Sequence, residues 1–114
     1  MGKERSYEKL ADGYEIKHVT STAEATYALT ANQRTCLVDA TSASGHITVE
    51  LPPLDLPGVR GHIYQVWLTA RTTSNVLVTD SNALATLWTL DATGESITCY
   101  SDGLRWIELA GTNT

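Results

Sequence analysis

Phenylalanine is absent from this 114-residue chain, methionine occurs once and proline only three times. No apolar run approaches the roughly 18 to 20 residues of a membrane-spanning helix, so we expect no membrane contact. The N-terminal run Met-Gly-Lys-Glu-Arg is charged and has no apolar segment behind it. That pattern does not fit a signal peptide, and it predicts synthesis in a cytoplasm.

Positive charge is also scarce. Eight Lys and Arg residues stand against thirteen Asp and Glu residues, which gives a formal net charge of −5. Binding to nucleic-acid phosphates needs a basic stripe, and outside the N-terminus the cations do not cluster. We therefore expect no nucleic-acid partner, and we attribute the negative charge to solubility.

The two cysteines, Cys36 and Cys99, lie far apart and lack the Cys-x-x-Cys spacing typical of metal or redox sites. Each lies inside a run that resembles a strand, where a free cysteine behaves as a small buried hydrophobic residue. The sequence favours two buried thiols over a disulfide, and a disulfide over a catalytic role.

No motif for catalysis or metal binding is present. The histidines lack the His-x-His or His-x-x-x-His spacing of zinc ligands, and no Gly-x-Ser-x-Gly motif occurs. The best pair of acids for glycoside hydrolysis, Glu50 and Asp55, is more typical of solvated surface carboxylates. We expect neither an enzyme nor a cofactor or metal site.

Threonine is the most frequent residue, and β-branched and aromatic residues are spread along the chain in short runs. From Thr26 onward the apolar period is close to two, as in strands. This period predicts strands over 27–30, 35–40, 46–51, 62–70, 75–79 and 84–90, followed by a hairpin over 94–110. Seven or eight strands about ten residues apart predict an all-β fold, a single antiparallel β-sandwich similar to a jelly roll.

Two of these segments carry the strongest signals. The segment 62–70 has apolar residues on both faces, so we expect it to be a central strand. Within the hairpin, Ser101-Asp102-Gly103 predicts a tight turn in which Gly103 takes a positive φ.

Residues 1–22 differ from the rest because they are rich in charges of both signs and poor in apolar anchors. We interpret them as an N-terminal arm and residues 23–114 as the β-sandwich domain. The arm could be a short helix over 7–10, an extended segment that orders against a partner, or a solvated terminus.

Three tryptophans, Trp67, Trp88 and Trp106, lie in predicted strands that also carry aliphatic residues. Aromatic rings can stack on sugars, and they also anchor cores and subunit interfaces. We favour packing in the core or at a subunit interface over a sugar platform for all three.

The segments Tyr27–Asp39, Ile47–Pro53, Gly61–Trp67 and Gly94–Trp106 follow one another in an order that resembles β-domains of bacteriophage head-decoration, head-fibre and tail-fibre proteins. The resemblance implies a structural role on the virion surface and a homotrimer. It transfers no catalytic residue. The chain lacks the long repetitive shaft of a tail fibre, which favours a short protein of the particle surface.

These observations lead to three functional hypotheses. The first is a capsid decoration (cement) protein that binds the major capsid protein, with Lys3, Arg5, Tyr7 and Tyr14 as capsid-anchoring residues. The second is a short head-fibre or tail-tip adhesin that binds host-surface glycan through aromatic residues. The third, a cell-wall hydrolase, lacks a recognisable nucleophile or metal set.

Overall fold

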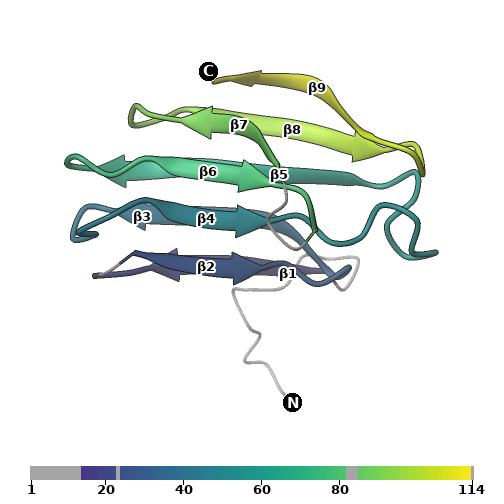
Figure 1. Ribbon diagram of the computed structural model, residues 1–114, viewed down its shortest axis with the longest axis horizontal. Helices are drawn as coiled ribbons and strands as arrows, with labels where there is room; N and C mark the ends of the chain where they lie inside the picture. Colours follow the sequence, from purple (N-terminus) through teal and green to yellow (C-terminus); the bar gives the residue numbers. More distant parts are fainter. Residues whose placement is uncertain (1–13, 23, 82–84, 114) are drawn as a thin grey trace, which may run out of the picture.

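The computed structural model describes residues 14–22, 24–81 and 85–113, and within them nine strands form two facing sheets (Figure 1). The five-stranded sheet has the order β1-β3-β5-β8-β9 and the four-stranded sheet the order β2-β4-β6-β7. The larger sheet contains β1 (Glu15–Thr20), β3 (Gln33–Ala40), β5 (Ile63–Arg71), β8 (Ser96–Ser101) and β9 (Trp106–Thr112). The smaller sheet contains β2 (Ala25–Ala28), β4 (Ile47–Glu50), β6 (Val76–Thr79) and β7 (Thr86–Leu90).

The all-β prediction is confirmed, and each segment predicted as a strand overlaps one. The predicted antiparallel arrangement is wrong, because both sheets are mixed. The pairs β1/β3, β3/β5, β2/β4 and β4/β6 are parallel. The pairs β5/β8, β6/β7 and β8/β9 are antiparallel.

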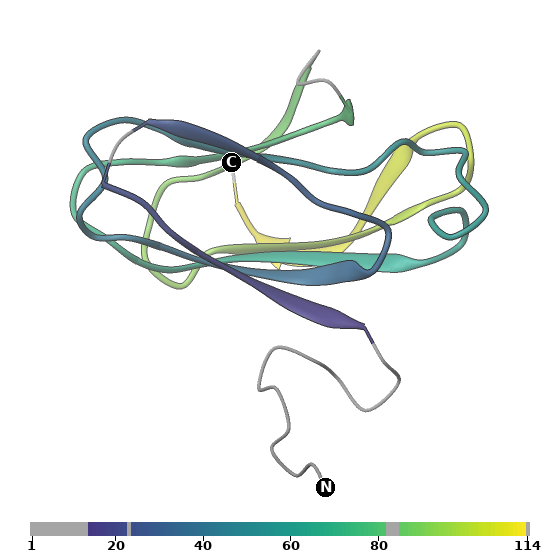
Figure 2. The same cartoon turned by 90° about the horizontal axis from the view of Figure 1, so that it is seen from below.

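The parallel pairs arise from the path of the chain. From β1 to β6 each strand is followed by a strand of the other sheet, so the chain winds around the space between the layers (Figure 2). Successive strands of one sheet then run in the same direction, and the strand in the opposite sheet serves as their crossover. The β6–β7 hairpin ends this winding, and β8 and β9 complete the larger sheet.

The expectation of an arm separate from the sandwich does not hold for Glu15–Thr20. This segment is β1, which pairs in parallel with β3 at the edge of the larger sheet. Its one fully buried apolar residue is Val19, opposite Val38. Edge strands need few buried side chains, which explains why the apolar pattern of this segment is weak. The rest of the predicted arm, residues 1–13, lies outside the described residues.

A single core fills the space between the sheets. Its side chains alternate along the strands, as the period of two predicts: Cys36 and Val38 on β3, and Ile47 and Val49 on β4, are fully buried. The predicted central position of the 62–70 strand is confirmed, since β5 is the middle strand of the larger sheet. Each buried aliphatic side chain of this kind contributes about 1.5–3 kcal/mol to folding.

The predicted final hairpin is also confirmed. Gly103 has a φ of +93°, a conformation that residues with a Cβ rarely adopt. The Asp102 carboxylate accepts hydrogen bonds from the backbone N–H groups of Leu104 and Arg105, at 2.8 and 2.9 Å. The Ser101 hydroxyl donates to the Leu54 carbonyl at 2.8 Å. This bond joins the turn to the loop over residues 52–57, which contains all three prolines.

Candidate functional site

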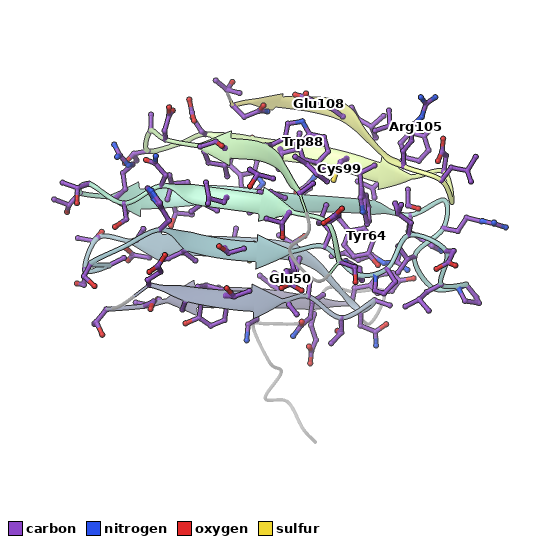
Figure 3. All side chains as sticks on the ribbon, in the orientation of Figure 1. Glu50, Tyr64, Trp88, Cys99, Arg105 and Glu108 are labelled. Atoms are coloured by element: carbon purple, nitrogen blue, oxygen red, sulfur yellow. The ribbon has the colours of Figure 1, made fainter. Side chains whose placement is uncertain are left out.

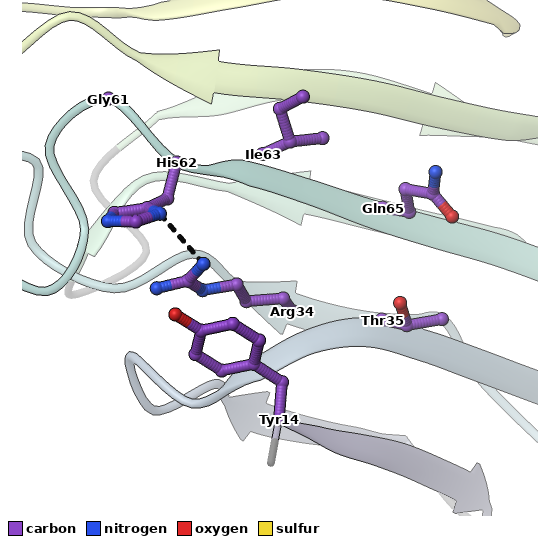
Figure 4. A pocket seen from close by; sticks show the side chains of 7 residues that line it. All are labelled: Tyr14, Arg34, Thr35, Gly61, His62, Ile63 and Gln65. Carbon is purple, nitrogen blue, oxygen red and sulfur yellow. Dashed lines mark hydrogen bonds between the residues drawn. The ribbon is translucent and has the colours of Figure 1, made fainter. Parts of the chain in front are cut away.

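Arg34 is the extra residue of a β-bulge at the start of β3. Glu15 pairs with Gln33 and Ile16 with Thr35, so Arg34 has no partner on β1. A bulge interrupts the regular alternation of a strand and redirects a side chain. Here it directs Arg34 toward the turn before β5 rather than along the sheet (Figure 4).

Three hydrogen bonds hold the Arg34 guanidinium in place. Nε donates to the Ala31 carbonyl at 3.3 Å, and Nη2 donates to the Gly58 carbonyl at 3.1 Å. Nη1 lies 2.7 Å from Nδ1 of His62. Because a guanidinium has donors only, His62 Nδ1 must be the acceptor, and the ring proton of this neutral tautomer is on Nε2.

Aromatic rings contact the same guanidinium. The Arg34 Cζ atom lies 3.6 Å from the centroid of the Tyr14 ring and 5.8 Å from that of Tyr64. Both distances are within the range of cation–π attraction. The Tyr64 hydroxyl donates to the Ala31 carbonyl at 2.7 Å, so Arg34 and Tyr64 share an acceptor. The pKa of Tyr64 is raised because its hydroxyl is desolvated, an effect that Arg34 partly offsets.

The positive charge of Arg34 is not neutralised by the described part of the chain. Among described residues the single ion pair is Arg105 with Asp102, at 3.5 Å. All three hydrogen-bond acceptors of Arg34 are neutral. A half-buried cation without a carboxylate partner is unusual in a chain with a net charge of −5.

Arg34 lies in an open hollow of about 650 Å³, which is shown in Figure 4. Its volume falls in the range of about 300–1,000 Å³ that small-molecule sites occupy. The hollow is lined by Tyr14, Arg34, Thr35, Gly61, His62, Ile63 and Gln65. It thus combines one cation, several neutral polar groups, and the exposed apolar side chain of Ile63.

The outer face of the five-stranded sheet, on which this hollow opens, is rich in apolar side chains. Two of them are substantially exposed: Ile63 by 49% and Trp67 by 39%. The strand register places Leu37 beside Trp67, and Tyr100 between Ile63 and Ile107. We call this surface, formed by Ile16, Leu37, Ile63, Trp67, Tyr100 and Ile107, the apolar face.

The outer face of the four-stranded sheet differs. Thr26, Thr48, Leu77 and Thr89 occupy one register row across its four strands. Glu50, labelled in Figure 3, is on the same face. The outer face of the four-stranded sheet is therefore suited to contact with water. The apolar face would be more stable if a partner covered it.

The structure separates the three tryptophans. Trp88 and Trp106 are partly buried and pack against the core, and Trp106 contacts Tyr64 edge to face. Trp67 lies on the apolar face, where its Nε1 donates to Gln65 at 3.4 Å. A period of two indicates that Trp67 faces away from Val66, but it does not indicate which side is the core.

Of the residues predicted to anchor the capsid, Lys3, Arg5 and Tyr7 lie outside the described residues. Tyr14 is described, and its ring stacks on Arg34. The sequence pattern does not indicate Arg34 as a site residue, because Arg34 falls between the predicted strands 27–30 and 35–40. Its contact with Tyr14 depends on the parallel β1/β3 pairing, which the pattern of side chains does not reveal.

Both cysteines are free and fully buried, as predicted. Burial raises the pKa of each thiol to about 12; Lys17 partly opposes the shift at Cys36, and Glu108 adds to it at Cys99. Such thiols are poor nucleophiles. Within residues 14–22, 24–81 and 85–113, no three His, Cys, Asp or Glu side chains form a metal-binding group. The same residues contain no helix long and apolar enough to cross a bilayer.

Comparison with known proteins gives no match: no family model, curated protein or solved structure is significantly similar to this chain.

Proposed function

We propose that this protein is a structural protein of a phage virion, a decoration (cement) protein that binds the assembled head and stabilises it. The observation that carries the proposal is the apolar face, with the exposed Trp67 on its central strand β5. Exposed apolar patches of this kind are typical of protein–protein contacts. The ordered resemblance to phage β-domains supports the same role.

We further propose that the protein is a homotrimer whose subunits contact one another through the apolar face. When three sheets surround a threefold axis, one face of each sheet contacts both neighbours, so a single apolar face per subunit is sufficient. The threonine-rich face would then remain in water. Covering Ile63 and Trp67 would remove the most exposed apolar side chains of this face from water.

Stabilisation of the head would follow from mass action. A protein that binds the assembled shell and not its free subunits adds its binding free energy to the assembled state. In this proposal Lys3, Arg5 and Tyr7 contact the major capsid protein. Tyr14 stacks on Arg34 and directly precedes β1. In this proposal it connects the anchoring residues to the sandwich.

The test is to locate the protein on purified particles with a gold-labelled antibody and electron microscopy. Label distributed over the head is expected, and label confined to the tail would contradict a decoration role. A variant without residues 1–12 keeps Tyr14 and β1. It should remain folded by circular dichroism and lose binding to undecorated heads, and full binding would exclude the anchoring residues.

A second candidate function, an adhesin for host-surface glycan, is supported by a different observation. The hollow at Arg34 presents polar side chains and one cation that has no carboxylate partner among the described residues. Label confined to the tail tip would favour this function. Loss of infection after blocking of the hollow, with particle assembly intact, would support it further.

A further inference from the structure

We propose that the hollow at Arg34 binds the carboxylate of an acidic sugar. This inference deepens the second candidate function, since it names the chemical class of the glycan. Its test uses the purified protein, so failure to bind an acidic sugar leaves the capsid role unaffected. The hollow opens on the apolar face, so binding of the sugar and assembly of the trimer through that face are alternative uses of one surface.

The first step of the argument is the hydrogen-bonding capacity of Arg34. The guanidinium has five N–H groups, and three of them donate to Ala31, Gly58 and His62. One N–H on Nη1 and one on Nη2 remain without a partner among the described residues. Two N–H groups on adjacent nitrogens match the two oxygens of a carboxylate.

The second step is preorganisation. Three hydrogen bonds and the Tyr14 ring at 3.6 Å already fix the guanidinium, so a ligand does not have to order a flexible side chain. Ordering such a side chain is one of the main costs of binding. A fixed Arg34 therefore favours recognition of a planar anion over unspecific attraction of counterions.

The third step is the charge of the ligand. Among the residues that line the hollow, Arg34 is the one side chain with a permanent positive charge. The other described cations lie elsewhere: Lys17 contacts the Tyr27 ring, the Arg60 guanidinium lies beside Gly103, Arg71 contacts the 73–75 turn, and Arg105 pairs with Asp102. One cation balances a carboxylate monoanion better than a phosphate dianion.

The fourth step concerns the rest of the ligand. Thr35 and Gln65 each offer a donor and an acceptor, and His62 offers the N–H of Nε2. Sugar hydroxyls donate and accept in the same way. Ile63 is 49% exposed at the rim, where it can cover the C–H surface of a pyranose ring. A hydroxyl-rich acid therefore fits the lining better than a simple aliphatic acid.

The experiment is an NMR titration of the ¹⁵N-labelled full chain with sodium glucuronate, at constant ionic strength. Glucose, acetate and inorganic phosphate serve as comparison ligands. Glucuronate is expected to shift the amide signals of residues around 34, 62 and 65, with a dissociation constant about tenfold or more below those of glucose and acetate. Phosphate should bind no better than acetate.

Two variants test the residues. Gln65→Glu is nearly isosteric, keeps the acceptor for Trp67 and introduces a negative charge into the hollow, so glucuronate binding should weaken about tenfold or more. Arg34→Lys keeps the charge without the paired N–H groups and should weaken binding as well. Arg105→Gln removes an exposed arginine outside the hollow, and binding should be unchanged.

Four results would overturn the proposal. Equal binding of glucuronate and glucose would exclude a role for the carboxylate. Equal binding of glucuronate and acetate would exclude the sugar and indicate the acidic side chain of a protein partner instead. Tighter binding of phosphate would exclude a carboxylate site, and undiminished binding by a folded Gln65→Glu variant would place the site elsewhere.

Discussion

Tyr64 and Trp106 meet edge to face, with ring centroids 5.4 Å apart and an interplanar angle of 87°. Tyr64 is fully buried on the central strand β5, whereas Trp106 begins the edge strand β9. Two strands that are not neighbours in the sheet are thereby joined through their side chains. An aromatic pair of this geometry contributes about 0.5–1.5 kcal/mol beyond the area it buries.

Replacing Trp106 by leucine should lower the free energy of unfolding by about 2 kcal/mol, because both the ring contact and part of the core packing are lost. Chemical denaturation followed by circular dichroism measures this change. Trp67→Leu is the matched control, and it should alter stability by less than about 1 kcal/mol since Trp67 does not reach the core. Equal effects would contradict the distinct roles of the two tryptophans.

Replacing Trp67 by serine should dissociate the proposed trimer. Tryptophan at the centre of an interface often contributes about 2 kcal/mol or more to association. Sedimentation velocity of the wild type and the variant gives the oligomeric state directly. Leu77→Ser makes the comparable change on the threonine-rich face and should leave the trimer intact. A wild-type protein that sediments as a monomer at all concentrations would refute assembly through the apolar face.

Replacing Gly111 by alanine should destabilise the β8–β9 pairing by about 3 kcal/mol or more. Gly111 has a φ of +133°, and a Cβ at this position would overlap the Ser96 carbonyl oxygen. Gly94 has a φ of +93° with open space around it, so Gly94→Ala tests the backbone strain alone and should cost about 1–2 kcal/mol. Comparing the denaturation midpoints of the two variants separates the cost of the steric overlap at Gly111 from the cost of backbone strain alone.

Stability should fall as the pH rises from about 9 toward 12. Burial raises the pKa of Cys36 and of Cys99 from 9.0 to about 12, so unfolded thiols ionise in this interval while the folded ones stay protonated. The unfolded state then releases more protons and is favoured by alkali. The contribution of the thiols is complete below pH 9.

Denaturant titrations at pH 8 and pH 10.5 measure the effect. The variant with Cys36→Ala and Cys99→Ala should be less stable at pH 8 because of the cavities, and its stability should depend less on pH. The raised pKa of Tyr64 acts in the same direction in both proteins, since its main cause is burial and Cys99 is the last of its contributors. An identical pH dependence of the two proteins would contradict buried, protonated thiols.

Only part of the candidate site was accessible to sequence reasoning. The sequence predicts Tyr14 as a site residue and a strand that begins at residue 62, but Arg34 falls between the predicted strands 27–30 and 35–40. Its position in a bulge, and its contacts with both residues, require β1 and β3 to be parallel neighbours. A bulge leaves no signature in the sequence when the redirected residue is an ordinary arginine.

The sequence alone determined the strands from β2 to β9, the buried cysteines and the Gly103 turn, because these depend on local alternation and on turn chemistry. The tertiary structure decided which strands pair, in which direction, and which apolar residues remain outside. An inward side chain such as Val66 and an outward one such as Trp67 follow the same period of two. The periodicity of a strand is the same in parallel and antiparallel sheets, so the course of the chain between the two layers is fixed only by packing over long distances.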